Sequence, residues 1–199
     1  MTEARATPWR AELSRKGIHL TSSIFPLSWG LGWVEPAVVR SALAAALMLA
    51  LTIEFARRRS PAVQRWFTSL FGGMLRPHEL SELTGATWIL AAMLLCALLL
   101  PARAAICGLW AGVVGDAAAA LAGRARAGRS AASSKTWTGS TACALASAAG
   151  PMWLAAAPPV AALGIGIAAA LAERPRVWID DNARVAIVAG LAAWGLGVA

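Results

Sequence analysis

The stretch Ala104-Ala-Ile-Cys-Gly-Leu-Trp-Ala-Gly-Val-Val-Gly-Asp-Ala-Ala-Ala-Ala-Leu-Ala122 is a long apolar run that carries one charged side chain, Asp116. It is long enough to span a membrane, because a transmembrane helix needs about 20 apolar residues, with a range of about 17–25. A carboxylate within such a helix costs about 2.5–3.5 kcal/mol on insertion scales, so it normally faces a partner, a metal ion or a water-filled cavity. The run therefore predicts a transmembrane helix with a polar site beside it.

Apolar runs of similar character occupy most of the chain on both sides of this stretch. The 199 residues are 58% hydrophobic and 14% charged, with a mean hydropathy of +0.61, whereas soluble domains are about 45–50% apolar and about 25% charged. Prolines mark the tight turns between several runs, since proline ends or opens a helix. We predict an all-α fold, a polytopic transmembrane helical bundle of about seven spans. The predicted spans are 18–34, 37–55, 85–101, 104–122, 140–156, 159–173 and 183–199.

The basic residues lie almost entirely on one side of this topology. If the N-terminal segment 1–17 is cytoplasmic, every Lys and Arg except Arg40 and Arg103 lies on the cytoplasmic side, in agreement with the positive-inside rule. We therefore expect an integral membrane protein of the cytoplasmic (inner) membrane of a bacterium, with Arg57-Arg58-Arg59 as a stop-transfer anchor. The net charge of +8 is spread over short stretches between apolar runs, so we expect no nucleic-acid partner.

The polar motifs also collect at the predicted inner face. Five segments that are distant in the sequence meet there, which predicts a site built between helices at the cytoplasmic interface. The segments are Arg15-Lys16-x-x-His19, Arg76-Pro77-His78-Glu79, Asp116, Lys135 to Ser140, and Asp180-Asp181-Asn182.

Asp116 is the residue that points most directly to chemistry. Helical spacing places Ala120, Gly123 and Arg124 on roughly the same face as Asp116, and Mg²⁺ prefers one or two carboxylates together with phosphate oxygens. We interpret Asp116, which follows Gly115, as a ligand for a magnesium–nucleotide complex that the neighbouring small residues allow to approach closely. The alternatives are a snorkelling or protonated aspartate near a helix end, and small-residue helix packing at Ala120 and Gly123.

The segment 123–140 is basic and rich in glycine and serine, a composition that suits phosphate binding by backbone N–H groups, hydroxyls and cationic side chains. Lys135, Thr136, Gly139 and Ser140 stand at the start of the next span, where a helix N-terminus adds positive charge. The segment is not a Walker A loop, because Lys135 follows a serine and not a glycine. The alternative is that the loop only marks the topology.

Three further motifs are candidates for the same site. In Arg15-Lys16-x-x-His19 the cations would bind phosphates and the histidine would orient one of them; the alternative is a cytoplasmic anchor. His78-Glu79 precedes the third span, and the alternative there is a polar loop with a helix cap. Asp180-Asp181-Asn182 precedes the last span and would supply a metal ligand or a general base; the alternative is a helix N-cap, for which Asp and Asn are preferred.

Together these motifs resemble the polyprenol kinase family, which includes dolichol kinase, phytol kinase and the CTP-dependent diacylglycerol kinase and is distantly related to phosphatidate cytidylyltransferase. The resemblance covers most of the chain and keeps the order of the motifs. In one departure, Thr138 stands where the family has a glutamate. If that glutamate binds metal or acts in proton transfer, this protein must use another carboxylate, or it is slow or inactive. The matching segments are Glu12-Leu-Ser-Arg-Lys-Gly-Ile-His19, His78-Glu79 with Leu83-Thr-Gly-Ala-Thr-Trp88, Gly115-Asp116-x-x-Ala119-x-x-x-Gly123, Lys135-Thr136 with Gly139-Ser140, and Asp180-Asp181-Asn182.

The resemblance implies a lipid kinase whose partners are a lipid alcohol, a nucleoside triphosphate (CTP or ATP) and membrane lipids, with Mg²⁺ or another divalent cation. It implies a single transmembrane catalytic domain over 18–199, in which Asp116 binds the metal, Lys135 neutralises phosphate charge and Asp180 or Asp181 takes the proton of the alcohol. A cytidylyltransferase-like enzyme and a non-catalytic lipid-binding or transport protein are the alternatives. The nucleotide- and phosphate-binding residues that the resemblance implies are Arg15, Lys16, His19, Gly115, Gly123, Arg124, Thr136, Gly139 and Ser140, with His78, Glu79 and Asn182 as further candidates.

Overall fold

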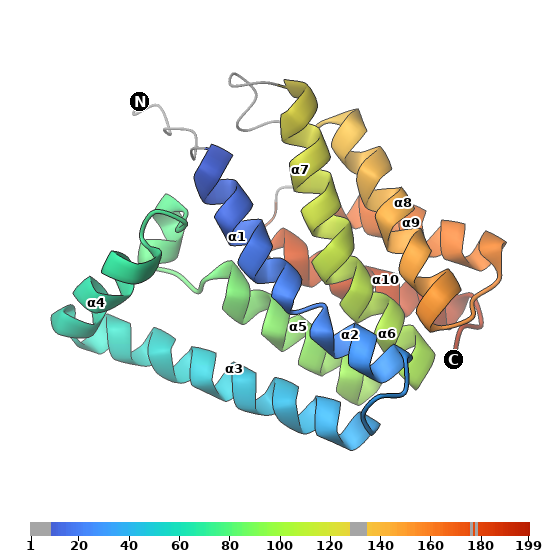
Figure 1. Ribbon diagram of the computed structural model, residues 1–199, viewed down its shortest axis with the longest axis horizontal. Helices are drawn as coiled ribbons and strands as arrows, with labels where there is room; N and C mark the ends of the chain where they lie inside the picture. The colour runs from blue at the N-terminus through green and yellow to red at the C-terminus, as the bar shows by residue number, and fades with distance from the viewer. Residues whose placement is uncertain (1–8, 128–134, 176, 178) are drawn as a thin grey trace.

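The computed structural model describes residues 9–127, 135–175, 177 and 179–199. These residues form helices joined by turns, with no strand in the described ranges, so the prediction of an all-α fold is confirmed for them (Figure 1). In chain order the helices are α1 (Trp9–Thr21), α2 (Ile24–Gly30), α3 (Pro36–Arg59), α4 (Pro61–Phe71), the 3₁₀ helix η1 (Pro77–Leu80), α5 (Gly85–Leu99), α6 (Ala102–Trp110), the π-helical turn η2 (Ala111–Gly115), α7 (Asp116–Ala127), α8 (Trp137–Leu154), α9 (Pro159–Glu173) and α10 (Asp181–Gly195).

Three of the α-helices begin at a proline. Pro36, Pro61 and Pro159 each stand in the first turn of α3, α4 and α9, where the missing N–H has no helical partner in any case and the fixed φ favours the helix. The predicted span 159–173 has the same bounds as α9, and 37–55 lies within α3. Proline therefore places these helix starts from the sequence alone.

The central element is the continuous helical rod formed by α6, η2 and α7. Helices α5, α8 and α10 pack around it, and α9 covers α8 and α10. Small residues permit this close packing: a Cβ at Gly108 would lie 2.6 Å from the Ala186 carbonyl oxygen, and one at Gly112 would lie 2.7 Å from the Ala186 Cβ. The π turn η2 ends immediately before Asp116, and single π turns inside helices are frequent at functional sites.

The first predicted span, 18–34, is not one helix. The chain forms α1 and α2 with a break at Ser22-Ser23, where the amides of Ser22 and Ser23 donate to His19 and Leu20 in the tighter i→i−3 pattern. Pro26 explains the break, since it has no N–H to donate to the carbonyl four residues earlier. Because α1 begins at Trp9, the predicted boundary between residues 17 and 18 falls within a helix, while residues 1–8 lie outside the described part of the chain.

Two of the described helices pass the length and hydropathy test for crossing a membrane, Pro36–Arg59 and Ala102–Ala125, and the apolar helices Gly85–Leu99 and Pro159–Glu173 are shorter. The core helix of a soluble protein passes the same test, but it is mostly buried. The window in the second helix is 72% buried and fits that description, whereas the window in the first is only 11% buried. Seven spans remain a prediction.

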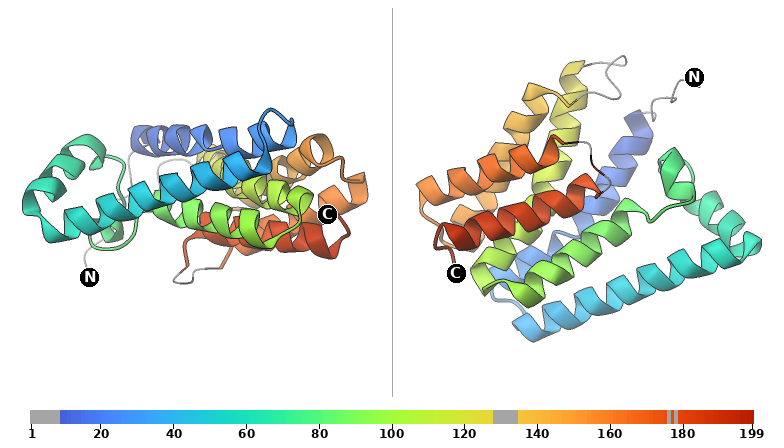
Figure 2. Two further views of the ribbon diagram at one scale, coloured as in Figure 1. Left: turned by 90° about the horizontal axis from the view of Figure 1, so that it is seen from below. Right: turned by 180° about the vertical axis from the view of Figure 1, so that it is seen from behind.

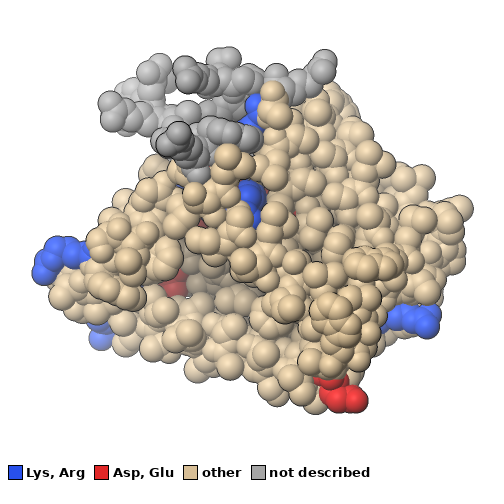
Figure 3. Space-filling model, viewed as in Figure 1, with Lys and Arg blue, Asp and Glu red and all other residues tan. Residues whose placement is uncertain are grey.

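The helix ends form two groups at opposite ends of the molecule. The N-terminal ends of α3, α6 and α9 and the C-terminal end of α10 lie toward one end, and the C-terminal ends of α3, α7 and α9 lie toward the other (Figure 1 and the right view of Figure 2). The predicted outer turns therefore share one end and the predicted inner connections share the other. The face shown in Figure 3 is mostly uncharged, with Lys, Arg, Asp and Glu near its margins and in a hollow.

Candidate functional site

A buried ion pair joins α1 to α7. The Lys16 ammonium contacts Oδ2 of Asp116, and the two side chains are only 3% and 4% exposed. His19 Nε2 lies 3.8 Å from the same carboxylate oxygen and 3.1 Å from the Gly112 carbonyl oxygen. The structure thus brings together three predicted site residues from distant segments, and Asp116 faces a cationic partner instead of snorkelling or lying at a helix end.

Glu12, which we did not predict, ties the predicted cations Arg15 and Arg124 to this pair. The Arg15 guanidinium contacts the Glu12 carboxylate, and Arg124 Nη2 lies 3.5 Å from Glu12 Oε2. Burial alone would raise the pKa of Glu12, but Arg15, Lys16 and Arg124 outweigh it and lower that pKa. The phosphate-binding role of Arg15 and Arg124 therefore competes with an internal carboxylate.

Lys135 connects three helices just before α8. Its Nζ donates to Oδ2 of Asp181 at 2.9 Å and contacts the carboxylate of Glu173, the last residue of α9. Burial alone would lower the pKa of Lys135, but these two carboxylates outweigh it and raise the pKa. Glu173 and Asp181 are thus the carboxylates beside Lys135 in this chain. The family that the chain resembles has a glutamate near this lysine, at the position of Thr138.

The predicted pair Asp180-Asp181 starts α10, and the two carboxylates differ. Asp180 is the N-cap: its Oδ1 accepts a hydrogen bond from the Asn182 amide at 3.0 Å, and its Oδ2 lies 3.6 Å from Arg76 Nη1. Burial and the adjacent Asp181 charge raise the pKa of Asp180 to about 6. Burial also acts to raise the pKa of Asp181, but Lys135 and Arg76 outweigh it and lower that pKa. Asp180 therefore titrates near neutral pH, whereas Asp181 stays ionised.

The predicted glycines serve helix packing. A Cβ at Gly139 would lie 2.8 Å from the Ala119 carbonyl oxygen and 3.4 Å from the Gly123 Cα, and Gly115 faces Ser147 at similarly close range. These contacts agree with the small-residue packing that was the alternative for Gly123, and they leave no room for a phosphate between α7 and α8. The centre of the predicted phosphate loop, residues 128–134, lies outside the described residues.

Thr136 and Ser140 also have internal partners. The Thr136 hydroxyl caps α8 by accepting a hydrogen bond from the Gly139 amide at 3.0 Å. The Ser140 hydroxyl accepts one from Arg174 Nη1 at 3.1 Å. Thr136 and Ser140 therefore position α8 and the end of α9 around Lys135.

The two residues of the predicted pair His78-Glu79 have different roles. Glu79 is buried and holds its loop together, because its carboxylate accepts hydrogen bonds from the amides of Arg76 at 2.7 Å and Gly85 at 2.8 Å. This is the capped polar loop that was the alternative interpretation. His78 is exposed and lines a cavity described below.

Arg57 has a structural role beyond the stop-transfer anchor that we predicted for Arg57-Arg58-Arg59. Its side chain is buried, pairs with Glu54 of the same helix, and donates to the carbonyl oxygens of Leu80 at 3.0 Å and Glu79 at 2.9 Å. Arg57 therefore fixes the loop that leads into α5. The sequence conceals this, because three consecutive arginines after an apolar run are typical of a plain anchor.

Replacing Arg57 with Met is expected to destabilise the fold by at least about 1–3 kcal/mol, since buried carbonyl oxygens and the Glu54 carboxylate lose their donor. The matched control is Arg58→Met, because Arg58 is 43% exposed and lies 3.7 Å from Glu54, and exposed pairs contribute about 0–1 kcal/mol. Thermal unfolding of the purified variants in detergent measures both changes. Equal stability of the two variants would contradict the structural role of Arg57.

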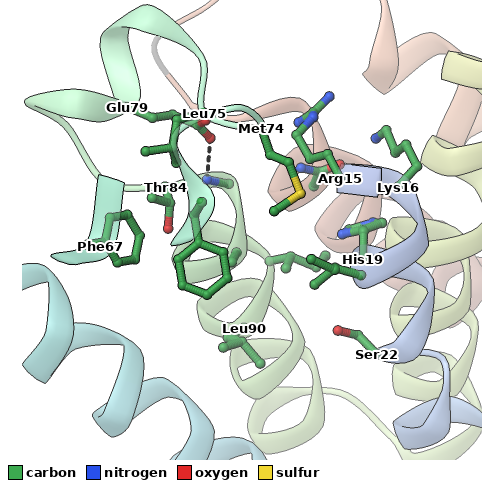
Figure 4. Close-up of a pocket in the computed structure, with 16 residues that line it drawn as sticks. Arg15, Lys16, His19, Ser22, Phe67, Met74, Leu75, Glu79, Thr84 and Leu90 are labelled. Atoms are coloured by element: carbon green, nitrogen blue, oxygen red, sulfur yellow. Dashed lines mark hydrogen bonds between the residues drawn. The ribbon is translucent and has the colours of Figure 1, made fainter. Parts of the chain in front are cut away.

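Between α1 and the loop that precedes α5 lies an elongated cavity of about 230 Å³, which we call the apolar cavity. The cationic end of α1, with Arg15, Lys16 and His19, faces Phe67 and Thr84 across it (Figure 4). Its walls are mostly apolar, and Asn182 and Glu79 add polar groups to the lining. The apolar wall residues are Ile18, Phe67, Phe71, Met74, Leu75, Ala86, Ile89 and Leu90.

A second cavity, of about 220 Å³, lies on the other side of the Asp180–Asn182 segment, and we call it the polar cavity. Asn182 lines the apolar cavity, whereas Asp180 and Asp181 line the polar one. A Cβ placed at Gly85, which lines the apolar cavity, would lie 3.7 Å from Asp180 Oδ2. The Asp180 carboxylate therefore stands between the two cavities. The charged residues that line the polar cavity are Arg76, Glu82, Lys135, Asp180, Asp181 and Arg184, together with His78.

Within the described residues, no group of three or more His, Cys, Asp or Glu side chains is close enough to hold a metal ion. Mg²⁺ also binds through one or two carboxylates plus phosphate oxygens. Asp181 fits such a site because its buried Oδ1 has no hydrogen-bond partner among the residues that the structure describes. For Asp116 the fit is poorer, since Lys16 already contacts its Oδ2. The residues thus fit a magnesium–nucleotide complex at Asp181 better than at Asp116.

Comparison of the chain with protein-family models, with curated proteins and with solved structures found no match. Function is therefore inferred from the residues and their geometry. Three of the charged residues that we did not predict, Glu173, Arg174 and Arg184, lie near the ends of apolar runs, as Asp181 does. The position at a run end is the signal that could have identified them.

Proposed function

We propose that this chain is a membrane-embedded lipid-alcohol kinase. It transfers the terminal phosphate of CTP or ATP to the hydroxyl of a polyprenol, a phytol-like alcohol or a diacylglycerol at the cytoplasmic face. The observation that supports this most is the apolar cavity, whose walls suit a hydrocarbon chain and whose polar end suits a hydroxyl and the phosphate it receives. Ligand sites commonly combine apolar walls with a few convergent polar groups in this way.

The surface supports a membrane location. Large apolar side chains are exposed along α3, including Met48, Leu49 and Phe55, and the apolar window of this helix is 11% buried. Monomeric soluble proteins rarely expose a contiguous apolar surface of this kind. We propose that α3 lies against lipid in the inner membrane of a bacterium, within a bundle of about seven spans whose N-terminus is cytoplasmic.

Asp180 is the proposed general base. It lies between the two cavities, and its pKa of about 6 suits proton transfer near neutral pH, because a catalytic base works best when its pKa is close to the operating pH. The alcohol oxygen forms a bond to the terminal phosphorus, its proton passes to the Asp180 carboxylate, and the bond from phosphorus to the nucleoside diphosphate oxygen breaks. Asp181 is the weaker candidate because Lys135 lowers its pKa.

The remaining residues position groups and balance charge, which is most of what phosphoryl transfer requires. Lys135 and Arg76 hold Asp181 and Asp180 in place and add positive charge at the polar cavity. When bound, Mg²⁺ would neutralise charge on the nucleotide phosphates, with Asp181 as the residue that would hold it. Lys16, fixed by Asp116, brings a cation to the end of the apolar cavity where the hydroxyl would lie.

Phosphate transfer is measured with the purified protein in lipid nanodiscs, from CTP or ATP labelled at the terminal phosphate to prenols, phytol and diacylglycerol. The expected products are a labelled lipid phosphate and the nucleoside diphosphate. A cytidine-linked lipid with released pyrophosphate would show a cytidylyltransferase instead. Absence of any product with every lipid, while lipid still binds, would show a non-catalytic lipid-binding protein.

A further inference from the structure

Arg184 is a half-buried cation that lines the polar cavity, and its donors are incompletely used. Its Nε and Nη1 atoms are buried and have no hydrogen-bond partner within the described residues. Arg184 lies in the first turn of α10, next to the proposed base and metal ligand, and its side chain lines the polar cavity. A buried donor without a partner is unfavourable, so this arrangement favours an anionic ligand that accepts those hydrogen bonds.

The other cations of the polar cavity have partners. Arg76 lies 3.6 Å from Asp180, and Lys135 donates to Asp181 at 2.9 Å and contacts Glu173. Their positive charge is therefore largely balanced by carboxylates of the protein. Arg184 differs because two of its guanidinium nitrogens have no hydrogen-bond partner among the described residues.

We propose that the polar cavity binds the polyphosphate of the nucleotide and that Arg184 anchors it. The proposal rests on the proposed kinase function and deepens it. The polar cavity is the phosphate subsite, the apolar cavity is the lipid subsite, and the segment Asp180–Asn182 lies between them. A guanidinium presents a rigid fork of donors that matches two phosphate oxygens. The N-terminus of α10 adds positive potential at the same place, and the unpaired Oδ1 of Asp181 is available for a divalent cation that accompanies the phosphates.

The division also reassigns the predicted phosphate-binding residues. Arg15, Lys16 and His19 line the apolar cavity, so they contact the acceptor end of the reaction. Lys135, Arg76 and Arg184 line the polar cavity, so they contact the donor. The transferred phosphate would pass between the two groups at Asp180.

The test measures binding of magnesium tripolyphosphate and of Mg–CTP to the purified full-length protein by isothermal titration calorimetry, without lipid substrate. Arg184→Ala is expected to weaken both ligands at least about tenfold, which corresponds to about 1.4 kcal/mol. Arg184→Lys is expected to recover part of the affinity, because it restores the charge but not the fork. The matched control is Arg103→Ala, which removes an exposed arginine at the opposite end of the molecule and is expected to bind like the wild type.

Unchanged affinity in a folded Arg184→Ala variant would overturn the proposal. If that variant does not fold, phenylglyoxal modification of the wild type followed by mass spectrometry replaces it: tripolyphosphate must protect Arg184 and must leave Arg103 unprotected. Binding through Arg184 without phosphorylation of any lipid would support the phosphate subsite and reject the kinase. Lipid phosphorylation with an unchanged nucleotide KM in Arg184→Ala would support the kinase and reject the subsite.

Discussion

Asp116→Asn is expected to destabilise the protein by about 3–5 kcal/mol and to reduce lipid phosphorylation at least about a hundredfold. The substitution leaves the Lys16 ammonium buried at 3% exposure without its carboxylate, and breaking one side of a buried ion pair costs about this much. The activity falls because Lys16 and His19 lose the carboxylate that orients them at the end of the apolar cavity. Thermal unfolding in detergent and the labelled-phosphate assay measure the two effects separately.

A double variant separates catalysis from stability. Replacing both members of a buried pair by apolar residues of similar size is often neutral or stabilising, so Lys16→Met with Asp116→Leu is expected to regain most of the unfolding free energy. Its activity is expected to remain lost, because the cation and the carboxylate are both absent. Recovery of activity together with stability would show that the pair is only structural and would remove it from the proposed site.

Asp180→Asn is expected to lower kcat by about 10²–10⁴-fold, the usual contribution of a general base. In the wild type, activity is expected to rise with pH through about 6, since the carboxyl is protonated below its pKa and only the ionised form accepts the proton of the alcohol. The variant has no such group, so this rising limb is expected to disappear. The measurement is the rate of lipid phosphorylation between pH 5 and 8. The rate is expected to be about 0.1 of its maximum one pH unit below the pKa and about 0.9 of its maximum one pH unit above it.

The Asp180→Asn variant is also its own control for folding. Asn is as good an N-cap as Asp, so the hydrogen bond that Oδ1 accepts from the Asn182 amide is retained. Its thermal stability is therefore expected to stay close to that of the wild type. A wild-type pH profile that is flat through pH 6, or a variant that keeps full kcat, would exclude Asp180 as the base.

Several elements were predictable because their cause is local. The single Asp within 104–122 predicts a polar partner, and Lys16 supplies it. Pro159 and the end of the apolar run predict the bounds of α9. The alternation of apolar runs and turns predicts the all-α fold. In each case neighbouring residues carry the information, through the missing proline N–H or through the cost of a charge among apolar side chains.

Other features were not predictable because their partners are distant in the sequence. Arg57 belongs to a basic cluster that looks like an anchor, and only the loop at 79–82 that packs against it shows its structural role. Gly123 and Gly139 suit phosphate binding in the sequence, but α7 and α8 cross at these positions.

The sequence by itself determined that the described part of the chain is helical and that most of its charged residues fall near the ends of apolar runs. Those properties depend on hydropathy and backbone hydrogen bonding, which act between near neighbours. Only the tertiary structure decided which carboxylate faces which cation, and that two cavities lie on either side of Asp180–Asn182. Charge pairing and cavity shape arise where helices that are distant in the sequence pack together. The sequence of one helix does not determine which other helix packs against it.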